Sequence, residues 1–208
     1  MIRCDHTVAC GKITRAASRE TASDGKHFVS FGISVQVMGR NGETGEMSIS
    51  VSTDMGFDSM NLPLGQKVIV TGTMTVRKKD GKTYFNLRSG EAVQKVEATE
   101  PDSIVADMFF RGRIGNKGIE AKTDKRGVQY QIFSAYSSDR NNGNIEFLWV
   151  NFLNFHPCNE PFLKAMSYVD IKGDLQIGVH EGNISLACKV RDIEPWQLEK
   201  QKTASYEK

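Results

Sequence analysis

The sequence predicts an all-β protein of two tandem five-stranded barrels, with short helices between some of the strands. Apolar and polar residues alternate with a period of two through most of the chain, which is typical of strands with one buried face. Glycines and the apolar residues around them recur at a constant spacing of about half the chain. A length of 208 residues accommodates one or two domains of roughly 100–150 residues each.

The repeat has a spacing of 101 residues. Three glycine pairs share this spacing, each inside a similar apolar alternation: Gly11 with Gly112, Gly72 with Gly173, and Gly81 with Gly182. Gly25 and Gly127 are 102 residues apart, which indicates one extra residue between the first two strands of the second copy. The sequence therefore contains two copies of one pattern.

The domain boundaries follow from this repeat. We expect a first domain over residues 1–99 and a second over residues 104–195, followed by a tail over residues 196–208. The polar segment 98–103 contains Pro101 and suits a short linker between the domains.

Each copy contains the same elements in the same order. The strands expected in the first copy lie at about residues 8–13, 28–37, 47–52 and 68–76, followed by a returning strand that begins with Phe85 and Leu87. A short helix is expected near Gly56–Leu62, and its counterpart near Glu160–Ser167. Asp80-Gly81 supplies the positive φ angles of a tight hairpin turn. Closing five strands into a barrel removes the unpaired edges of the sheet, and this element order is that of the OB-fold.

Composition excludes several classes of protein. No apolar run reaches the ~18 residues of a membrane span, and residues 1–5 lack the apolar core of a signal peptide. The four cysteines are scattered without a Cys-x-x-Cys pair, which favours reduced thiols in a cytoplasmic protein over a zinc module. The net charge of +2 excludes a strongly basic coat but permits local basic patches.

The chain shows no arrangement typical of catalysis. The histidines are dispersed, no acidic cluster suits a metal ion, and the glycine-rich segment 39–45 lacks the Lys-Ser/Thr of a phosphate-binding loop. We therefore expect a protein that is not an enzyme and that needs no metal or cofactor.

The second copy is predicted to carry aromatic side chains on its outer face. Alignment with the core positions of the first copy turns four of them outward: Tyr130, Tyr136, Phe147 and Trp149. The inward positions between them are Phe133, Ala135, Leu148, Val150 and Phe152. Such a surface can stack on bases, but aromatic residues are also enriched where proteins contact one another. A register slip of one residue would exchange the two faces.

Candidate phosphate contacts lie mainly in the first copy. Its long hairpin carries four cations around Asp80: Arg77, Lys78, Lys79 and Lys82. Its outer-face aromatics are Phe28 and Tyr84. Further candidates lie in the loops after the first strands and on the first strand of the second copy: Arg15, Arg19, Lys26, Lys122, Lys125, Arg126, Arg111 and Arg113. Cations of this kind bind the phosphates of a single strand, although charges at a hairpin tip also serve solubility.

Four segments of the chain resemble the bacterial and phage single-stranded DNA-binding proteins. They are Gly25–Val35 for the second strand, Leu64–Met74 for the fourth, Arg77–Tyr84 for the basic hairpin, and Ile145–Phe152 for an aromatic third strand. The resemblance covers about residues 6–96 and 108–194. It implies phosphate contact by the hairpin, and a homodimer that presents four barrels.

Two features depart from that family. The tail after Trp196 is mixed in charge, whereas family members often end in an acidic tail that recruits replication partners. The third strand of the first copy carries hydroxyl groups where the family places aromatics. Of the two tryptophans, we expect Trp149 to lie within the binding surface and Trp196 outside it.

The sequence favours a protein that binds single-stranded DNA with little sequence preference. Such a protein would protect the strand in replication, recombination or repair, with replication or recombination proteins as partners, in a cell's nucleoid or as a phage protein in the host cytoplasm. Three alternatives remain open: an OB-fold interaction module of a primosome or recombination complex, a structural subunit of a phage, and a nuclease on a similar barrel.

Overall fold

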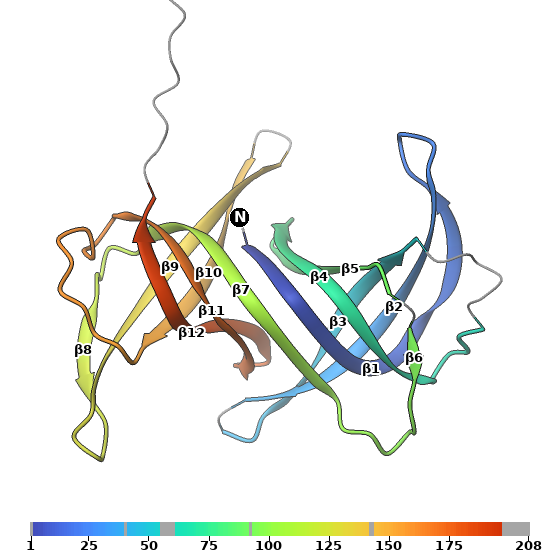
Figure 1. Cartoon of the computed structure of the whole chain (residues 1–208), viewed down its shortest axis with the longest axis horizontal. Coiled ribbons are helices and arrows are strands. Elements are labelled where there is room, and N and C mark those ends of the chain that lie inside the picture. Colours follow the sequence, from blue (N-terminus) through green and yellow to red (C-terminus); the bar gives the residue numbers. More distant parts are fainter. Residues whose placement is uncertain (1, 40, 55–60, 92, 142–143, 197–208) are drawn as a thin grey trace, which may run out of the picture.

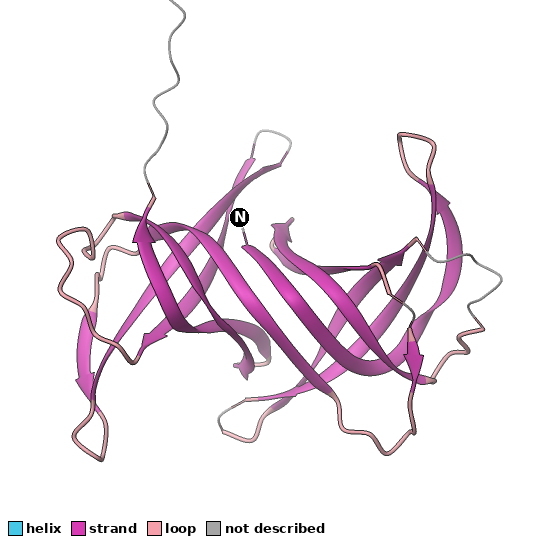
Figure 2. Cartoon of the chain, viewed as in Figure 1, coloured by secondary structure: helices cyan, strands magenta, loops and turns pink. Residues whose placement is uncertain are grey.

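The computed structural model describes residues 2–39, 41–54, 61–91, 93–141 and 144–196. These residues form twelve strands joined by loops and turns, and no helix occurs among them (Figure 1, Figure 2). A helix able to cross a membrane is therefore absent from the described part of the chain. The strands are β1 (Ile2–Thr21), β2 (His27–Met38), β3 (Thr44–Thr53), β4 (Lys67–Lys79), β5 (Lys82–Ser89), β6 (Gln94–Lys95), β7 (Ser103–Ile114), β8 (Glu120–Thr123), β9 (Gln129–Asn141), β10 (Asn144–Asn154), β11 (Tyr168–His180) and β12 (Asn183–Pro195).

The strand pairings close each half of the chain on itself. In the first half β1 pairs with β2, β2 with β3, β3 with β5 and β5 with β4, and β4 pairs again with β1. The second half repeats this ring as β7, β9, β10, β12 and β11, which pairs again with β7. The pairings β3–β5 and β10–β12 are parallel and the others are antiparallel.

Pairing between β1 and β7 joins the two halves into one sheet. Residues 2–10 of β1 lie antiparallel to residues 103–110 of β7 in the middle of the molecule (Figure 1). The same part of β1 pairs along its other edge with β4, so that both of its edges are occupied. A second link lies at the tip of β11, where Val179 packs against Gly39 and Gly45 beside the β2–β3 turn.

The 101-residue repeat reappears in the register of the strands. Lys12 lies opposite Lys67 in the first half, and Arg113 lies opposite Tyr168 at the equivalent position of the second. Equivalent strands therefore carry equivalent residues opposite one another, and the two halves can be compared position by position.

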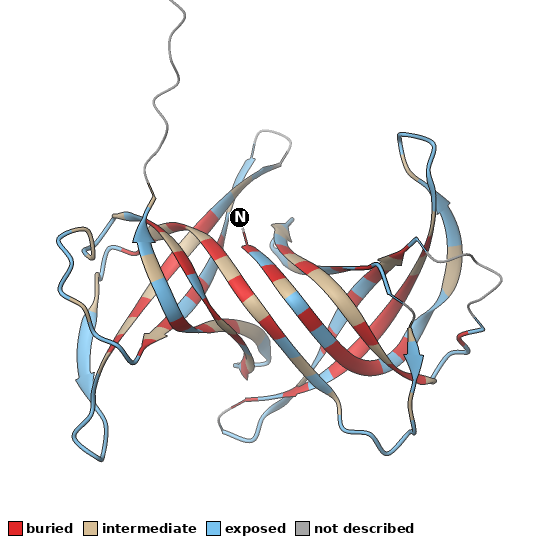
Figure 3. Cartoon of the chain, viewed as in Figure 1, coloured by how far each residue is buried: buried red, intermediate tan, exposed pale blue. Residues whose placement is uncertain are grey.

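The core lies inside the two rings and follows the predicted alternation. Phe31, Phe110 and Phe152 are fully buried, and buried bands alternate with exposed ones along the strands (Figure 3). The ring of Phe152 packs 4.9 Å from that of Phe110 and 5.1 Å from that of Phe133, measured between centroids. Aromatic side chains of this size contribute much of the area buried in a core.

At Gly72 and Gly173 the neighbouring strand leaves no room for a side chain. A Cβ atom on Gly72 would lie 2.1 Å from the carbonyl oxygen of Arg88, and one on Gly173 would lie 2.1 Å from that of Lys189. Both distances are far shorter than van der Waals contact, so only glycine fits. The repeated glycine thus has a steric reason in each half.

The two predicted hairpin turns are confirmed. Asp80 and Gly81 have φ angles of 51° and 75°, and Glu181 and Gly182 have φ angles of 51° and 73°. Positive φ at both central residues is what a two-residue hairpin turn with the twist of its strands requires.

The helix predicted near Glu160–Ser167 is wrong. This segment forms turns, closed by backbone hydrogen bonds such as that from the Leu163 amide to the Glu160 carbonyl. Pro161 restricts the residue before it to extended conformations, and Met166 has a φ angle of 67°, which no α-helix contains. Of the helix predicted near Gly56–Leu62, residues 56–60 lie outside the described residues, and Asn61 and Leu62 lie in a loop.

Candidate nucleic-acid interface

The side chains of β9 and β10 face the directions predicted for them. Leu148, Val150 and Phe152 of β10 are buried, whereas Phe147 and Trp149 are 45% and 49% exposed. On β9 the inward positions Phe133 and Ala135 are also buried. Tyr130 and Tyr136 lie on the outer face and are half-buried.

Three of the predicted aromatic residues form one cluster, the aromatic triad of Tyr136, Phe147 and Trp149. The Tyr136 ring lies 4.9 Å from that of Trp149 and 5.1 Å from that of Phe147, between centroids. Register explains the contact, because Trp149 lies directly opposite Tyr136 and side chains so placed share a face. The Trp149 ring also lies against Gly115, where a Cβ atom would approach it to 3.1 Å.

Tyr130 lies apart from the triad, near the other end of β9. Its ring stacks on Phe155 with the centroids 5.6 Å apart, and the Lys189 ammonium lies 5.8 Å from the centroid of Phe155. Sequence reasoning missed Phe155 and Lys189. Phe155 continues the outward alternation of Phe147 and Trp149, which is a signal that could have found it.

The register extends the triad into a row across four strands. Trp149 of β10 lies opposite Tyr136 of β9, Tyr136 opposite Arg113 of β7, and Arg113 opposite Tyr168 of β11. We call Trp149, Tyr136, Arg113 and Tyr168 the cross-strand row. The Arg113 guanidinium lies 5.1 Å from the centroid of the Tyr168 ring, which suits a cation–π contact.

Arg111 and Arg113 differ in their charge partners. Arg111 donates two hydrogen bonds to the Asp170 carboxylate, of 2.7 and 2.6 Å, and the hydrogen bond with Asp170 raises the pKa of Arg111. Arg113 donates from Nε to the carbonyl oxygen of Met166 at 2.7 Å. Within the described ranges no carboxylate lies within ion-pair distance of Arg113. Its positive charge is therefore available to a ligand, whereas that of Arg111 is neutralised.

Trp196, which follows β12, lies beside Arg111. The Arg111 guanidinium is 5.1 Å from the centroid of the Trp196 ring, and that ring packs edge-to-face on Tyr168 at 5.4 Å. Trp196 thus contacts Arg111, one of the candidate residues, and the expectation that it lies outside the binding surface stays a prediction. Nothing local in the sequence indicates this contact, because it joins residues from β7, β11 and the end of β12.

The equivalent row in the first half is polar, and its last member, Lys67, is buried in an ion pair. Ser48, Ser34, Lys12 and Lys67 occupy the positions of Trp149, Tyr136, Arg113 and Tyr168. The Lys67 ammonium lies 2.6 Å from the carboxylate of Asp102, which belongs to the linker between the halves. The side chains of Lys67 and Asp102 are only 6% and 11% exposed.

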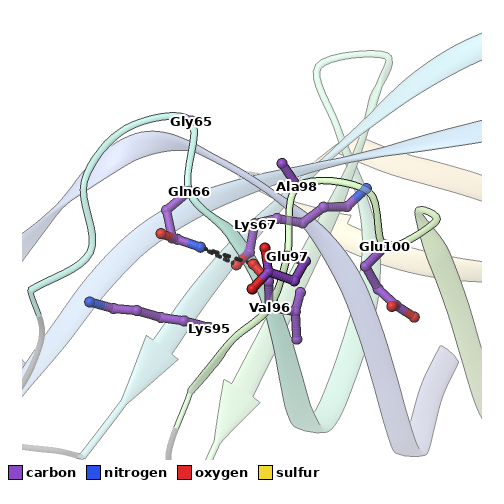
Figure 4. Close-up of a pocket in the computed structure, with 8 residues that line it drawn as sticks. All are labelled: Gly65, Gln66, Lys67, Lys95, Val96, Glu97, Ala98 and Glu100. Atoms are coloured by element: carbon purple, nitrogen blue, oxygen red, sulfur yellow. Dashed lines mark hydrogen bonds between the residues drawn. The ribbon is translucent and has the colours of Figure 1, made fainter.

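Figure 4 shows the cavity beside Lys67, next to the linker. A polar cavity of about 660 Å³ is lined there by Gly65, Gln66, Lys67, Lys95, Val96, Glu97, Ala98 and Glu100. The Gln66 side-chain amide donates to the carbonyl oxygens of Lys67 at 2.8 Å and Val96 at 3.2 Å. Val96, just before the linker, is thus held to the start of β4 by a hydrogen bond, and the linker is held there by the ion pair of Asp102 with Lys67.

The first half instead presents a groove rich in hydroxyl and amide groups. It has a volume of about 380 Å³ and is lined by Thr14, Arg15, Gly32, Ile33, Ser48, Ile49, Ser50, Lys82, Thr83, Tyr84, Phe85 and Asn86. Arg15 is held there by hydrogen bonds to Ser30, Ser50 and the carbonyl oxygen of Phe31. Tyr84 is exposed at the edge of the groove, and Phe28 is half-buried outside it.

The predicted basic hairpin lies at the β4–β5 turn. Arg77, Lys79 and Lys82 are exposed and Lys78 is half-buried. Among the described residues none of the four has a carboxylate partner within ion-pair distance. β4 contacts β9 and β10, and Figure 1 shows the β4–β5 turn directed toward the β9–β10 hairpin. The fold therefore brings the basic strand of one half to the aromatic strands of the other.

The cations of the β1–β2 and β8–β9 loops do not lie beside the basic hairpin. Lys26 lies in the β1–β2 loop, 3.5 Å from the Asp24 carboxylate. Lys125 and Arg126 are exposed in the β8–β9 loop, where Asp124 accepts a hydrogen bond from the Arg126 amide. Figure 1 shows these two loops at opposite ends of the molecule, so their cations do not form one patch.

Three solved structures are similar to this chain. No protein-family model and no curated protein matches the chain. A deletion mutant of the single-stranded DNA binding protein from Thermus aquaticus aligns over 97% of this chain and 98% of its own, with 15% identity and a TM-score of 0.47. The wild-type protein aligns over 95% and 94%, with 12% identity and a TM-score of 0.46.

The third structure is a murine DNA binding protein bound with double-stranded DNA. It aligns over 94% of this chain and 98% of its own, with 7% identity and a TM-score of 0.28. With all three TM-scores below 0.5, these likenesses assign no function to the chain.

Proposed function

We propose that the chain binds single-stranded DNA with little sequence preference and without catalysis. In this proposal each ring of strands is an OB-fold barrel, the first over residues 1–99 and the second over 104–195, with a tail over 196–208. The observation that carries it is the aromatic triad, in which the Tyr136 ring packs on both Phe147 and Trp149 and the latter two are about half exposed. Exposed rings of this kind stack on bases of any sequence.

Single strands fit this surface better than duplexes. Base faces are accessible only where bases are not stacked in a double helix. The triad offers ring faces for stacking, whereas a duplex is read by hydrogen bonds to base edges in its grooves. The four cations of the basic hairpin have no carboxylate partner among the described residues. They would hold the phosphates next to the stacked bases.

The wider role follows from this chemistry. A protein that covers bases and phosphates keeps the strand unpaired and protects it during replication, recombination or repair. We propose that it acts in the cytoplasm as a homodimer, beside the nucleoid or on phage DNA, with replication or recombination proteins as partners.

Trp149→Ala tests the stacking directly. The substitution should weaken binding of oligo(dT) by about 1–3 kcal/mol, or about 5- to 150-fold. The dependence of affinity on salt should stay the same, because no cation is removed. Fluorescence anisotropy of labelled oligo(dT) at several salt concentrations measures both quantities.

Val150→Ala is the matched control, because Val150 is the next residue on the same strand and is fully buried. It should lower the free energy of unfolding by about 1–3 kcal/mol through lost burial and a cavity, with unchanged affinity of the folded molecules. If Trp149→Ala instead unfolds or dissociates the protein while affinity per folded molecule is kept, the triad is a protein interface and the proposal fails.

A further inference from the structure

The aromatic triad accounts for only part of the cross-strand row. The row continues from Tyr136 through Arg113 to Tyr168, and Tyr168 in turn packs on Trp196. Since residues directly opposite one another on antiparallel strands share a face, all four members of the row point to the same side of the sheet. Tyr168 is 37% exposed on that side, so part of its surface is open to a ligand.

The positive charge in the row lies between two aromatic groups. Arg113 lies opposite Tyr136 on one side and opposite Tyr168 on the other, and no carboxylate among the described residues neutralises it. A single strand carries one base and one phosphate in each nucleotide. Two rings with a guanidinium between them can therefore contact bases on either side of a phosphate.

Strand spacing sets the reach of such a site. Three intervals between neighbouring strands separate Trp149 from Tyr168, and at about 4.8 Å each they span roughly 14 Å. A stacked strand rises by about 3.4 Å per nucleotide along its axis, so roughly four or five stacked nucleotides, or fewer in an extended strand, cover the distance.

The first half lacks the groups needed for a second subsite. At the position of Tyr168 it has Lys67, whose ammonium is buried against Asp102 of the linker. At the position of Trp149 it has Ser48. The feature is therefore specific to the second half and is not a general consequence of the repeated fold.

We propose that Tyr168 is a second base-stacking position, supported by Trp196, and that Arg113 binds the phosphate between it and the triad. The inference rests on the proposed function. The ligand is then a short single strand that crosses β10, β9, β7 and β11, with about four or five nucleotides if it stays stacked and fewer if it is extended. The alternative path runs along β10 from the triad toward Phe155 and Tyr130.

The two tryptophans allow a direct test, because the chain contains only these two. In Trp149→Phe, the remaining Trp196 lies 5.4 Å from Tyr168 and should be quenched when (dT)8 is added. In Trp196→Phe, the remaining Trp149 should be quenched at the same stoichiometry. Both substitutions keep an aromatic ring, which limits their effect on folding.

The outcomes separate the inference from the proposed function. Quenching of Trp149 without quenching of Trp196 would refute the second subsite and leave the triad as the binding surface. Failure of (dT)8 to bind the unaltered protein would refute the proposed function itself. Quenching of both tryptophans supports the second subsite.

Affinity measurements distinguish the two paths of the strand. Tyr168→Ala should weaken (dT)8 binding by about 5- to 150-fold, and Phe155→Ala should leave it within about 2-fold. The reverse result would place the strand along β10 and overturn the inference.

Arg113→Ala should flatten the slope of log affinity against log salt by about 0.7. Lys172→Ala is the control and should not change that slope, because Lys172 is an exposed cation of β11 paired with Asp192. If Arg113→Ala and Lys172→Ala change the slope equally, the result counts against the proposal.

Discussion

The buried ion pair between Lys67 and Asp102 allows a quantitative test of how the linker is held. Its charged atoms are 2.6 Å apart, and both side chains are almost completely buried. Asp102 also accepts a 2.6 Å hydrogen bond from the backbone amide of Gln36. Asp102→Asn removes the negative charge but retains an oxygen that can accept this bond. The substitution therefore isolates the effect of leaving the Lys67 ammonium without its counter-charge.

The expected cost follows from burial. Removing one partner of a buried ion pair typically costs about 3–5 kcal/mol, because the remaining charge stays out of water without compensation. Since the linker is at the surface and can admit some water, we expect about 3 kcal/mol for Asp102→Asn. For a chain of this length, each kcal/mol lowers the melting temperature by roughly 2–4 °C, so the expected decrease is about 6–12 °C.

A double-mutant cycle separates the pair from other effects. Lys67→Met should cost about as much as Asp102→Asn, because it leaves the carboxylate uncompensated. The double variant should be close to the unaltered protein, since replacing both partners of a buried pair is often neutral. Urea unfolding followed by circular dichroism gives the three free energies. Single variants that each cost less than about 1 kcal/mol, with no coupling between them, would show that the pair does not hold the linker.

Three further outcomes are expected. Replacing the four cations of the basic hairpin with alanine should flatten the salt dependence of oligo(dT) binding by up to about 2.8, and an unchanged slope would assign the hairpin to solubility alone. Gly173→Ala should cost about 1–3 kcal/mol of unfolding free energy, whereas Gly90→Ala, which meets no atom within 4 Å, should change it by less than about 1 kcal/mol. Hydrogen bonds from His6 and then Arg191 lower the pKa of Asp107. Its contribution to stability is therefore present above about pH 3.9 and is lost as pH falls through the lower folded-state pKa, so the stability of Asp107→Asn should change less between pH 5 and pH 2 in acid titrations of unfolding.

Local patterns in the sequence predicted the five main strands of each half and their faces, but not the short strands β6 and β8. Alternation with a period of two depends only on which side of a sheet is buried. It therefore correctly predicted that Trp149 faces outward and Val150 inward. The glycine spacing aligned the second copy with the first and located both hairpin turns. The helix near Glu160–Ser167 failed because its pattern was transferred from the first copy, although Pro161 in this segment opposes it.

Contacts between distant strands could not be read from the sequence. Arg111 was expected to contact phosphate, but its carboxylate partner Asp170 lies 59 residues away and meets it only through the pairing of β7 with β11. The contact of Trp196 with Tyr168 has the same origin. Pairing between β1 and β7 was also not predicted, because hydrophobic alternation specifies the faces of a strand and does not specify its neighbour.

The pairing of β1 with β7 resembles the interface of a two-fold dimer, but it is formed within one polypeptide. Covalent linkage fixes the effective concentration of the two halves in the millimolar range or above, so their association does not depend on how much protein is present. A symmetric dimer of identical chains must carry the same residue at both equivalent positions. Here one position holds Trp149 and the other Ser48, so each half can change its surface independently while the shared sheet is retained.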